Sequence, residues 1–112
     1  MFFITQENEL ASELKLHALY FYASWMPYHS KMLIMIDKME EKHKDIAFFA
    51  VDVDAFKGLC RRFDVNSVPT VIITNNGYEI KRITGIVMTS AFNSAFADIY
   101  NSSNTINGEN NE

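Results

Sequence analysis

The sequence predicts an α/β domain in which helices cover both faces of a mixed five-stranded sheet. Residues 17–23 and 46–53 are almost wholly apolar, which is typical of strands buried on both faces. Helical patterns join these strands, and a hairpin and a closing helix follow them. The predicted order of elements is therefore β-α-β-α-β-α-β-β-α.

The N-terminal elements precede the first of the buried strands. Residues 2–5 form a short apolar segment that suits an edge strand. Residues 6–14 carry Leu10, Ala11 and Leu14 at helical spacing, which predicts a first helix. The strand at residues 17–23 comes next.

The longest helical pattern runs from Pro27 to about Lys44. Met32, Ile36 and Met39 recur at i, i+4 and i+7 and predict its buried face. Pro27 suits the first helical turn, where the missing N–H is no loss. Because residues 32–36 are apolar nearly all round, this helix is expected to lie at the centre of the fold.

A short helix is predicted after the second buried strand. Asp54 can cap a helix over residues 55–63. Leu59, Cys60 and Phe63 share one face of that helix, so a buried structural cysteine is the expected role of Cys60.

The remaining elements are a hairpin and a final helix. The β-branched residues 70–74 and the alternating residues 79–84 predict two strands, joined by Asn75-Asn76-Gly77. Thr89 or Ser90 can cap the last helix. An apolar stripe then follows, formed by Phe92, Ala95, Phe96 and Ile99.

The domain is expected to occupy residues 1–101. Residues 102–112 are polar and almost without apolar anchors, which predicts a disordered tail. A chain of 112 residues with 48% hydrophobic residues suits one globular domain.

Charge and cysteine content limit the classes of function. A net charge of −4 argues against broad affinity for nucleic acid or an anionic membrane. One cysteine cannot form an internal disulfide, so no oxidising compartment is required. The first residues have neither the basic start nor the apolar length of a signal peptide, and a cytoplasmic location is expected.

Several short motifs occur together in one order and spacing. They are Ala23-Ser24-Trp25 before a turn, Val51-Asp52-Val53-Asp54, Arg62-Phe63-Asp64-Val65, Val68-Pro69-Thr70, Asn76-Gly77 and Thr84-Gly85. Over residues 2–100 the chain thereby resembles the thioredoxin family. The resemblance implies the thioredoxin fold, with Pro69 in the cis form facing the turn and the backbone of Val68 pairing with an extended substrate peptide.

The chain departs from the family pattern where the family performs its chemistry. Met26 and His29 stand at the positions of the two active-site cysteines. Tyr20 and Ala50 stand at the positions of the buried acid and its lysine partner, and Ile34 replaces the proline of the helix. Thiol–disulfide exchange needs a thiolate and a resolving thiol. The sequence therefore predicts a redox-inactive member of the family.

The predicted function is binding of a protein or an extended peptide. An apolar groove around the former active-site turn would contact the partner, because aromatic residues and methionine are enriched in interface cores. Its predicted members are Trp25, Met26, Pro27, Tyr28, Val68, Pro69 and Ile86. No cofactor and no metal is expected.

Other functions remain open. Cys60 could serve a divergent thiol oxidoreductase that works with glutathione or a partner thiol, and the chain could instead be a subunit of a larger assembly. Met26 and His29 together offer ligands for copper(I), although two ligands alone are few for a metal site. His29 could act as a general base if the fold supplied an orienting partner. The groove residues could also be remnants of the fold with no binding role.

Overall fold

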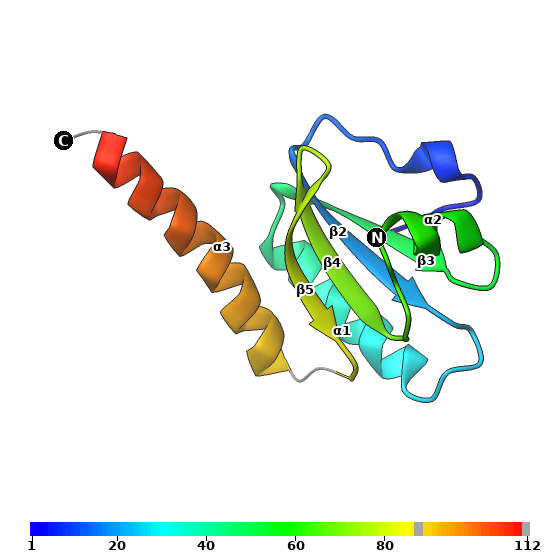
Figure 1. Cartoon of the computed structure of the whole chain (residues 1–112). Coiled ribbons are helices and arrows are strands. Elements are labelled where there is room, and N and C mark those ends of the chain that lie inside the picture. Colours follow the sequence, from blue (N-terminus) through cyan, green and yellow to red (C-terminus); the bar gives the residue numbers. More distant parts are fainter. Residues whose placement is uncertain (87–88, 111–112) are drawn as a thin grey trace.

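The computed structural model describes residues 1–86 and 89–110. Five strands form one sheet in the order β1-β3-β2-β4-β5 (Figure 1). The strands are β1 (Phe2–Phe3), β2 (Leu16–Tyr22), β3 (Ile46–Asp52), β4 (Thr70–Asn75) and β5 (Tyr78–Thr84). Strands β1, β3 and β2 are parallel, whereas β4 and β5 are antiparallel to their neighbours. The predicted mixed sheet is confirmed.

Helices cover both faces of the sheet. They are the 3-10 helix η1 (Glu7–Glu9) and the α-helices α1 (His29–Lys42), α2 (Lys57–Arg62) and α3 (Thr89–Asn110). Successive side chains of a strand point to opposite faces. Tyr20 therefore packs in the cluster that holds the buried residues of α1 and α3, and its neighbour Phe21 packs in the cluster that holds Leu59 of α2.

The first predicted helix is mostly absent. Only Glu7–Glu9 is helical, and Ala11 and Leu14 are exposed rather than on a buried stripe. The Glu9 carboxylate accepts from the N–H of Gln6 at 2.8 Å and supports the start of this short helix. Beyond it, Ser12 Oγ accepts from the N–H of Leu14 at 3.1 Å, and such a local bond competes with the helical ladder.

Helix α1 begins two residues later than Pro27. Tyr28 precedes it in the left-handed backbone conformation, with φ 68°, so Pro27 belongs to the turn and not to the helix. Met32, Ile36 and Met39 are buried as predicted, but Ile34 is 59% exposed. The helix therefore lies on one face of the sheet rather than inside the fold.

Helix α2 is also shorter than predicted. It starts at Lys57, and Asp54 does not cap it. The carboxylate of Asp54 instead accepts a hydrogen bond from the indole of Trp25. The short helix still buries Leu59 as expected.

The last helix extends beyond the predicted boundary. Phe92, Ala95, Phe96 and Ile99 are buried, which confirms the apolar stripe. The helical backbone then continues to Asn110, where irregular chain was expected, and that end points away from the sheet (Figure 1). Polar composition disfavours packing against a core but does not forbid helical geometry, and the segment has no proline. Residues 111–112 lie outside the described part of the chain, and the division into domain and tail stays a prediction.

None of the helices within the described ranges is long and apolar enough to cross a membrane.

Candidate functional site

The turn after β2 presents aromatic side chains to solvent. Trp25 is 70% exposed, and its Nε1–H donates to Oδ2 of Asp54 at 3.0 Å. Tyr28 is exposed as well, and the ammonium of Lys31 lies 5.5 Å from its ring centroid. The hydrogen bond to Asp54 links this turn to the segment that follows β3.

A second loop, which leads into β4, lies beside that turn. The Val68–Pro69 peptide bond is cis, as the resemblance implied. The N–H of Gly85 donates to the carbonyl of Pro69 at 2.8 Å, and Thr70 Oγ1 donates to the carbonyl of Ser67 at 2.8 Å. These bonds fix the end of the loop that enters β4.

A pocket of about 460 Å³ opens between the turn and this loop. Its lining residues come from the turn, the segment after β3, helix α2 and the cis-proline loop: Trp25, Val53, Cys60, Val65, Asn66, Ser67 and Val68. The lining is uncharged and mostly apolar, which suits an apolar side chain of a ligand.

The structure separates the seven predicted groove residues into two groups. Trp25, Pro27, Tyr28 and Ile86 are exposed, and Val68 is partly buried, so these side chains offer surface to a partner. Met26 is only 6% exposed and packs in the core with α1, and Pro69 is buried. These two residues support the turn and the loop from beneath. Of the seven, Trp25 and Val68 line the pocket, whereas the other five residues lie outside its lining.

Cys60, which was expected to be buried, lines the pocket and also packs against the core cluster that holds Leu59. It is partly buried, and its Sγ lies 3.9 Å from the carbonyl of Val53. Burial raises the pKa of the thiol, and the nearby Arg61 opposes this effect only in part. The thiol therefore stays protonated at neutral pH, which lowers its reactivity.

The sequence contained a signal for this location. The carboxyl ends of neighbouring parallel strands meet at one edge of a sheet, so the segments after β2 and β3 had to lie together. Val53 and Cys60 belong to the second of these segments and its helix.

A cluster of rings lies beneath the turn. The hydroxyl of Tyr20 and Nδ1 of His29 are joined by a hydrogen bond of 2.8 Å, and Tyr22 stacks on His29 with ring centroids 4.6 Å apart. Tyr20 is 1% exposed, and burial, with a smaller effect of the neighbouring Tyr22, raises its pKa far above the ordinary value. Tyr20 and His29, which the resemblance aligned with the family's buried acid and second cysteine, thus contact each other.

This cluster bears on the open alternatives for His29. Its partner is a tyrosine hydroxyl rather than a carboxylate, so it lacks the charged orienting group of a typical catalytic histidine. Within residues 1–86 and 89–110, no group of three His, Cys, Asp or Glu side chains could hold a metal ion.

The class of protein follows from these features together. A mixed sheet in this order, helices on both faces, a solvent-exposed turn after the central strand and an adjacent cis-proline define a thioredoxin-fold protein. The family model for thioredoxin matches residues 4–98, and the chain belongs to the thioredoxin family.

Named relatives agree with this assignment. Thioredoxin-2 of Saccharomyces cerevisiae is 34% identical over 79 residues, which cover 70% of this chain and 76% of that protein. Thioredoxin-1 of Caenorhabditis elegans is 37% identical over 73 residues, covering 65% of this chain and 64% of that protein.

Solved structures show the same fold at lower identity. The thioredoxin NaTrxh of Nicotiana alata superposes with a TM-score of 0.77 at 22% identity, covering 87% of this chain and 90% of that one. Mitochondrial thioredoxin 3 of Saccharomyces cerevisiae, in its oxidized form, gives 0.77 at 23% identity, with coverage of 88% and 94%.

Proposed function

We propose that this thioredoxin-family protein binds an extended peptide segment of a protein partner and performs no thiol–disulfide exchange. The observation that supports it most is the pocket of about 460 Å³ between Trp25 and Val68. An apolar side chain of the bound segment fills this pocket, and its flanking backbone runs along the cis-proline loop.

The state of Trp25 favours binding. The indole of Trp25 is 70% exposed in the unbound chain. Tryptophan is enriched among the residues at the centres of protein interfaces. Its hydrogen bond to Asp54 restricts its orientation before a partner arrives. Less conformational freedom is then lost on binding.

The sequence supports the proposed lack of thiol–disulfide exchange. Dithiol chemistry needs a nucleophilic thiolate and a second thiol, and the chain has one cysteine. The raised pKa of Cys60 disfavours its thiolate as well.

Partner capture with matched variants tests the binding site. The wild-type protein and Trp25→Ala are used as baits in an extract of the native host. Ile34→Ala is the control, because Ile34 is also an exposed apolar residue, at 59%, but does not line the pocket. The captured proteins should be lost with Trp25→Ala and retained with Ile34→Ala. A synthetic peptide from a captured partner should then shift the single tryptophan indole signal in an NMR titration.

Two results would contradict the proposal. If Trp25→Ala and Val68→Asp each still captured the same partners, another surface would be the binding site, as expected for a subunit of a larger assembly. A peptide that binds without moving the Trp25 indole signal would exclude the pocket.

A second candidate function is thiol chemistry at Cys60, because Cys60 lines the same pocket as Trp25. Glutathione or a partner thiol would then supply the second sulfur. Reduction of insulin by dithiothreitol tests this alternative. A rate above the uncatalysed one, abolished by Cys60→Ser, would overturn the redox-inactive proposal.

A further inference from the structure

A second pocket, of about 300 Å³, lies at the other end of strand β2. It is formed by the loop before β2, the first residues of β2, the end of α2 and the turn between β4 and β5. Seven residues of strand separate this end of β2 from the end that leads to Trp25, which amounts to about 20 Å. The two pockets share no lining residue and are distinct sites.

Hydrogen bonds fix the loop that forms one wall of this second pocket. The N–H of Asn76 donates to the carbonyl of Lys15 at 2.9 Å and ties the loop to the β4–β5 turn. Nε2 of His17 bonds to the carbonyl of Leu14 at 3.0 Å and ties it to β2. The wall is thus held in place without a ligand.

The lining of this pocket is basic in an acidic protein. The cationic residues Lys15 and Arg62 line it, and none of its lining residues is acidic, although the whole chain carries a net charge of −4. A concave surface with one sign of charge concentrates small ions of the opposite sign.

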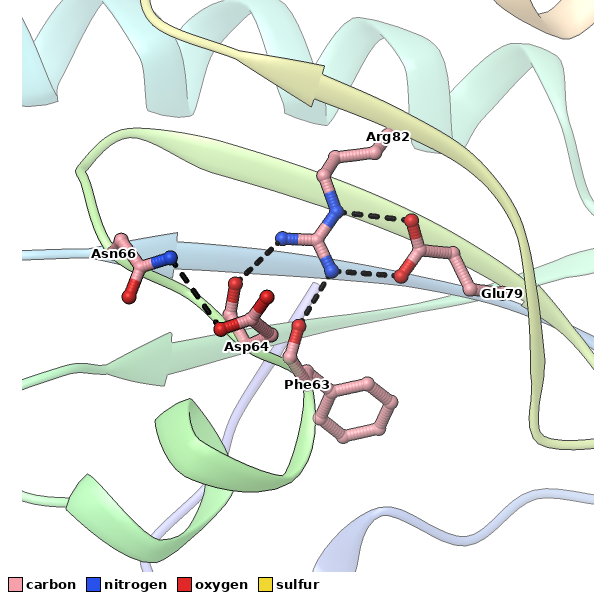
Figure 2. Close-up of polar contacts among 5 residues, drawn as sticks. All are labelled: Phe63, Asp64, Asn66, Glu79 and Arg82. Atoms are coloured by element: carbon pink, nitrogen blue, oxygen red, sulfur yellow. Dashed lines mark hydrogen bonds and ion pairs between the residues drawn. The ribbon is translucent and has the colours of Figure 1, made fainter.

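The carboxylate on the adjacent strand is already neutralised. Glu79 pairs with the lining residue Thr74 across the sheet. Arg82 donates to both oxygens of Glu79, at 2.9 and 2.7 Å (Figure 2), and this contact lowers the pKa of the carboxyl group. Glu79 therefore does not cancel the charge of Lys15 and Arg62.

Apolar side chains form another part of the lining. Leu19 is buried, and Leu10 and Phe63 are partly buried around it. The guanidinium of Arg62 lies 5.0 Å from the ring centroid of Phe63, so charge and apolar surface are adjacent. A volume of about 300 Å³ is at the lower limit for small-molecule pockets.

We propose that this pocket binds a small organic anion, with its acidic group held by Lys15 and Arg62 and its apolar part against Leu19 and Phe63. Arginine and lysine both form charge-assisted hydrogen bonds to phosphate and carboxylate groups. The inference does not depend on the proposed peptide site.

NMR titration of the full chain with phenyl phosphate tests this proposal. The amide signals of Ser12, Asn76 and Gly77 should shift in a saturable way, and the indole signal of Trp25 should not. Phenol, which lacks the charge, and inorganic phosphate, which lacks the ring, should each bind at least about tenfold more weakly. Benzoate at equal concentration distinguishes carboxylate from phosphate ligands.

Two charge-matched variants complete the test. Arg62→Gln should weaken phenyl phosphate binding about fivefold or more, whereas Arg61→Gln should leave it unchanged. Arg61 is next to Arg62 in the same helix but does not line the pocket, so both variants change the net charge equally. Equal losses in the two variants, or shifts spread over the whole surface, would overturn the proposal, and so would phenol binding as tightly as phenyl phosphate.

Discussion

At the scale of single residues, Tyr20 and His29 hold the turn after β2 to the sheet. Their hydrogen bond is 2.8 Å long, and their rings stack with centroids 5.9 Å apart. The resemblance aligned both residues with positions that hold other residue types in the family, and here the two side chains contact each other. The turn is thus held by ring contacts and a hydrogen bond.

Tyr20→Phe should therefore destabilise the protein. The ring stays in place, but a partly buried nitrogen of His29 loses its partner, which costs about 1–2 kcal/mol. Urea unfolding followed by circular dichroism measures the change. Tyr78→Phe is the matched control, because Tyr78 is 79% exposed and should tolerate the loss of its hydroxyl. Equal stability of the wild type and Tyr20→Phe would show that the hydrogen bond contributes nothing.

Asp54→Ala tests the orientation of Trp25. Without the carboxylate acceptor the indole should become more mobile, and peptide affinity should fall about threefold to tenfold because more side-chain freedom is lost on binding. Trp25 is the only tryptophan, so its fluorescence anisotropy reports this motion directly. Asp37→Ala, an acidic residue on α1, is the control. An unchanged anisotropy in Asp54→Ala would contradict the role given to the hydrogen bond.

At the scale of elements, burial patterns predicted the fold better than local signals predicted helix ends. The buried strands and the apolar stripe of α3 could be predicted from the sequence, because the spacing of apolar residues shows which face of an element is buried. Asp54 was predicted as a cap, but its carboxylate bonds Trp25, a residue distant in the chain. Such contacts between distant segments also bring Cys60 to the pocket, and no local pattern contains them.

The candidate site was predictable to a similar degree. Trp25 and the Val68–Pro69 loop could be identified because they belong to motifs with a recognisable spacing. The burial of Met26 could not be predicted, since the residues of a turn face solvent or core without a fixed period.

Arg82 joins two elements that are separate in sequence. From β5 it donates to the carbonyls of Phe63 and Asp64 at the end of α2, and also to Glu79 on its own strand (Figure 2). Arg82→Ala should cost about 1–3 kcal/mol, since it removes charge-assisted hydrogen bonds to two carbonyl groups.

The neighbouring residue provides the control for this variant. Lys81 forms an exposed ion pair with Asp98 at 3.3 Å, so Lys81→Ala should change stability by less than about 1 kcal/mol. Urea unfolding of both variants measures the difference. If Lys81→Ala were as destabilising as Arg82→Ala, the stabilising role assigned to the hydrogen bonds of Arg82 would be contradicted.

Helix α3 is held to the rest of the domain by polar contacts as well as apolar ones. Tyr100 donates to Oδ1 of Asp45 at 2.7 Å and is hydrogen-bonded to Nδ1 of His43 at 3.1 Å. The ring of His43 also stacks on Phe96. The turn after α1 and the middle of α3 are thereby joined.

This contact predicts a pH dependence of stability. Burial lowers the pKa of His43 below its ordinary value of 6.5, with the nearby carboxylate of Asp45 acting in the opposite direction. The unfolded chain then binds a proton more readily than the folded one, so stability rises with pH up to about 6.5. Below that pH the wild type should lose stability relative to His43→Gln, as measured by urea unfolding between pH 5 and 7.5. Parallel pH profiles for both proteins would contradict this effect.

At the scale of the whole molecule, one apolar layer lies on each side of the sheet. One contains Tyr20 and the buried residues of α1 and α3, and the other contains Phe21 and Leu59. Neither layer depends on a disulfide, because the chain has a single cysteine. The stability of a single chain therefore comes from noncovalent contacts.

The midpoint of urea unfolding should accordingly be the same with and without dithiothreitol. Any difference would have to come from a disulfide between two chains through Cys60. Such a difference should increase with protein concentration and vanish in Cys60→Ser. A difference that persists in Cys60→Ser would contradict the prediction.

The order of strands also affects how copies of the molecule meet. One edge of the sheet is β1, which has only two residues and offers few backbone groups to another strand. The other edge is β5, which carries Glu79, Lys81 and Arg82. Short edge strands and charged edge residues both oppose the addition of further strands. The sheet is therefore protected at both edges against edge-to-edge aggregation.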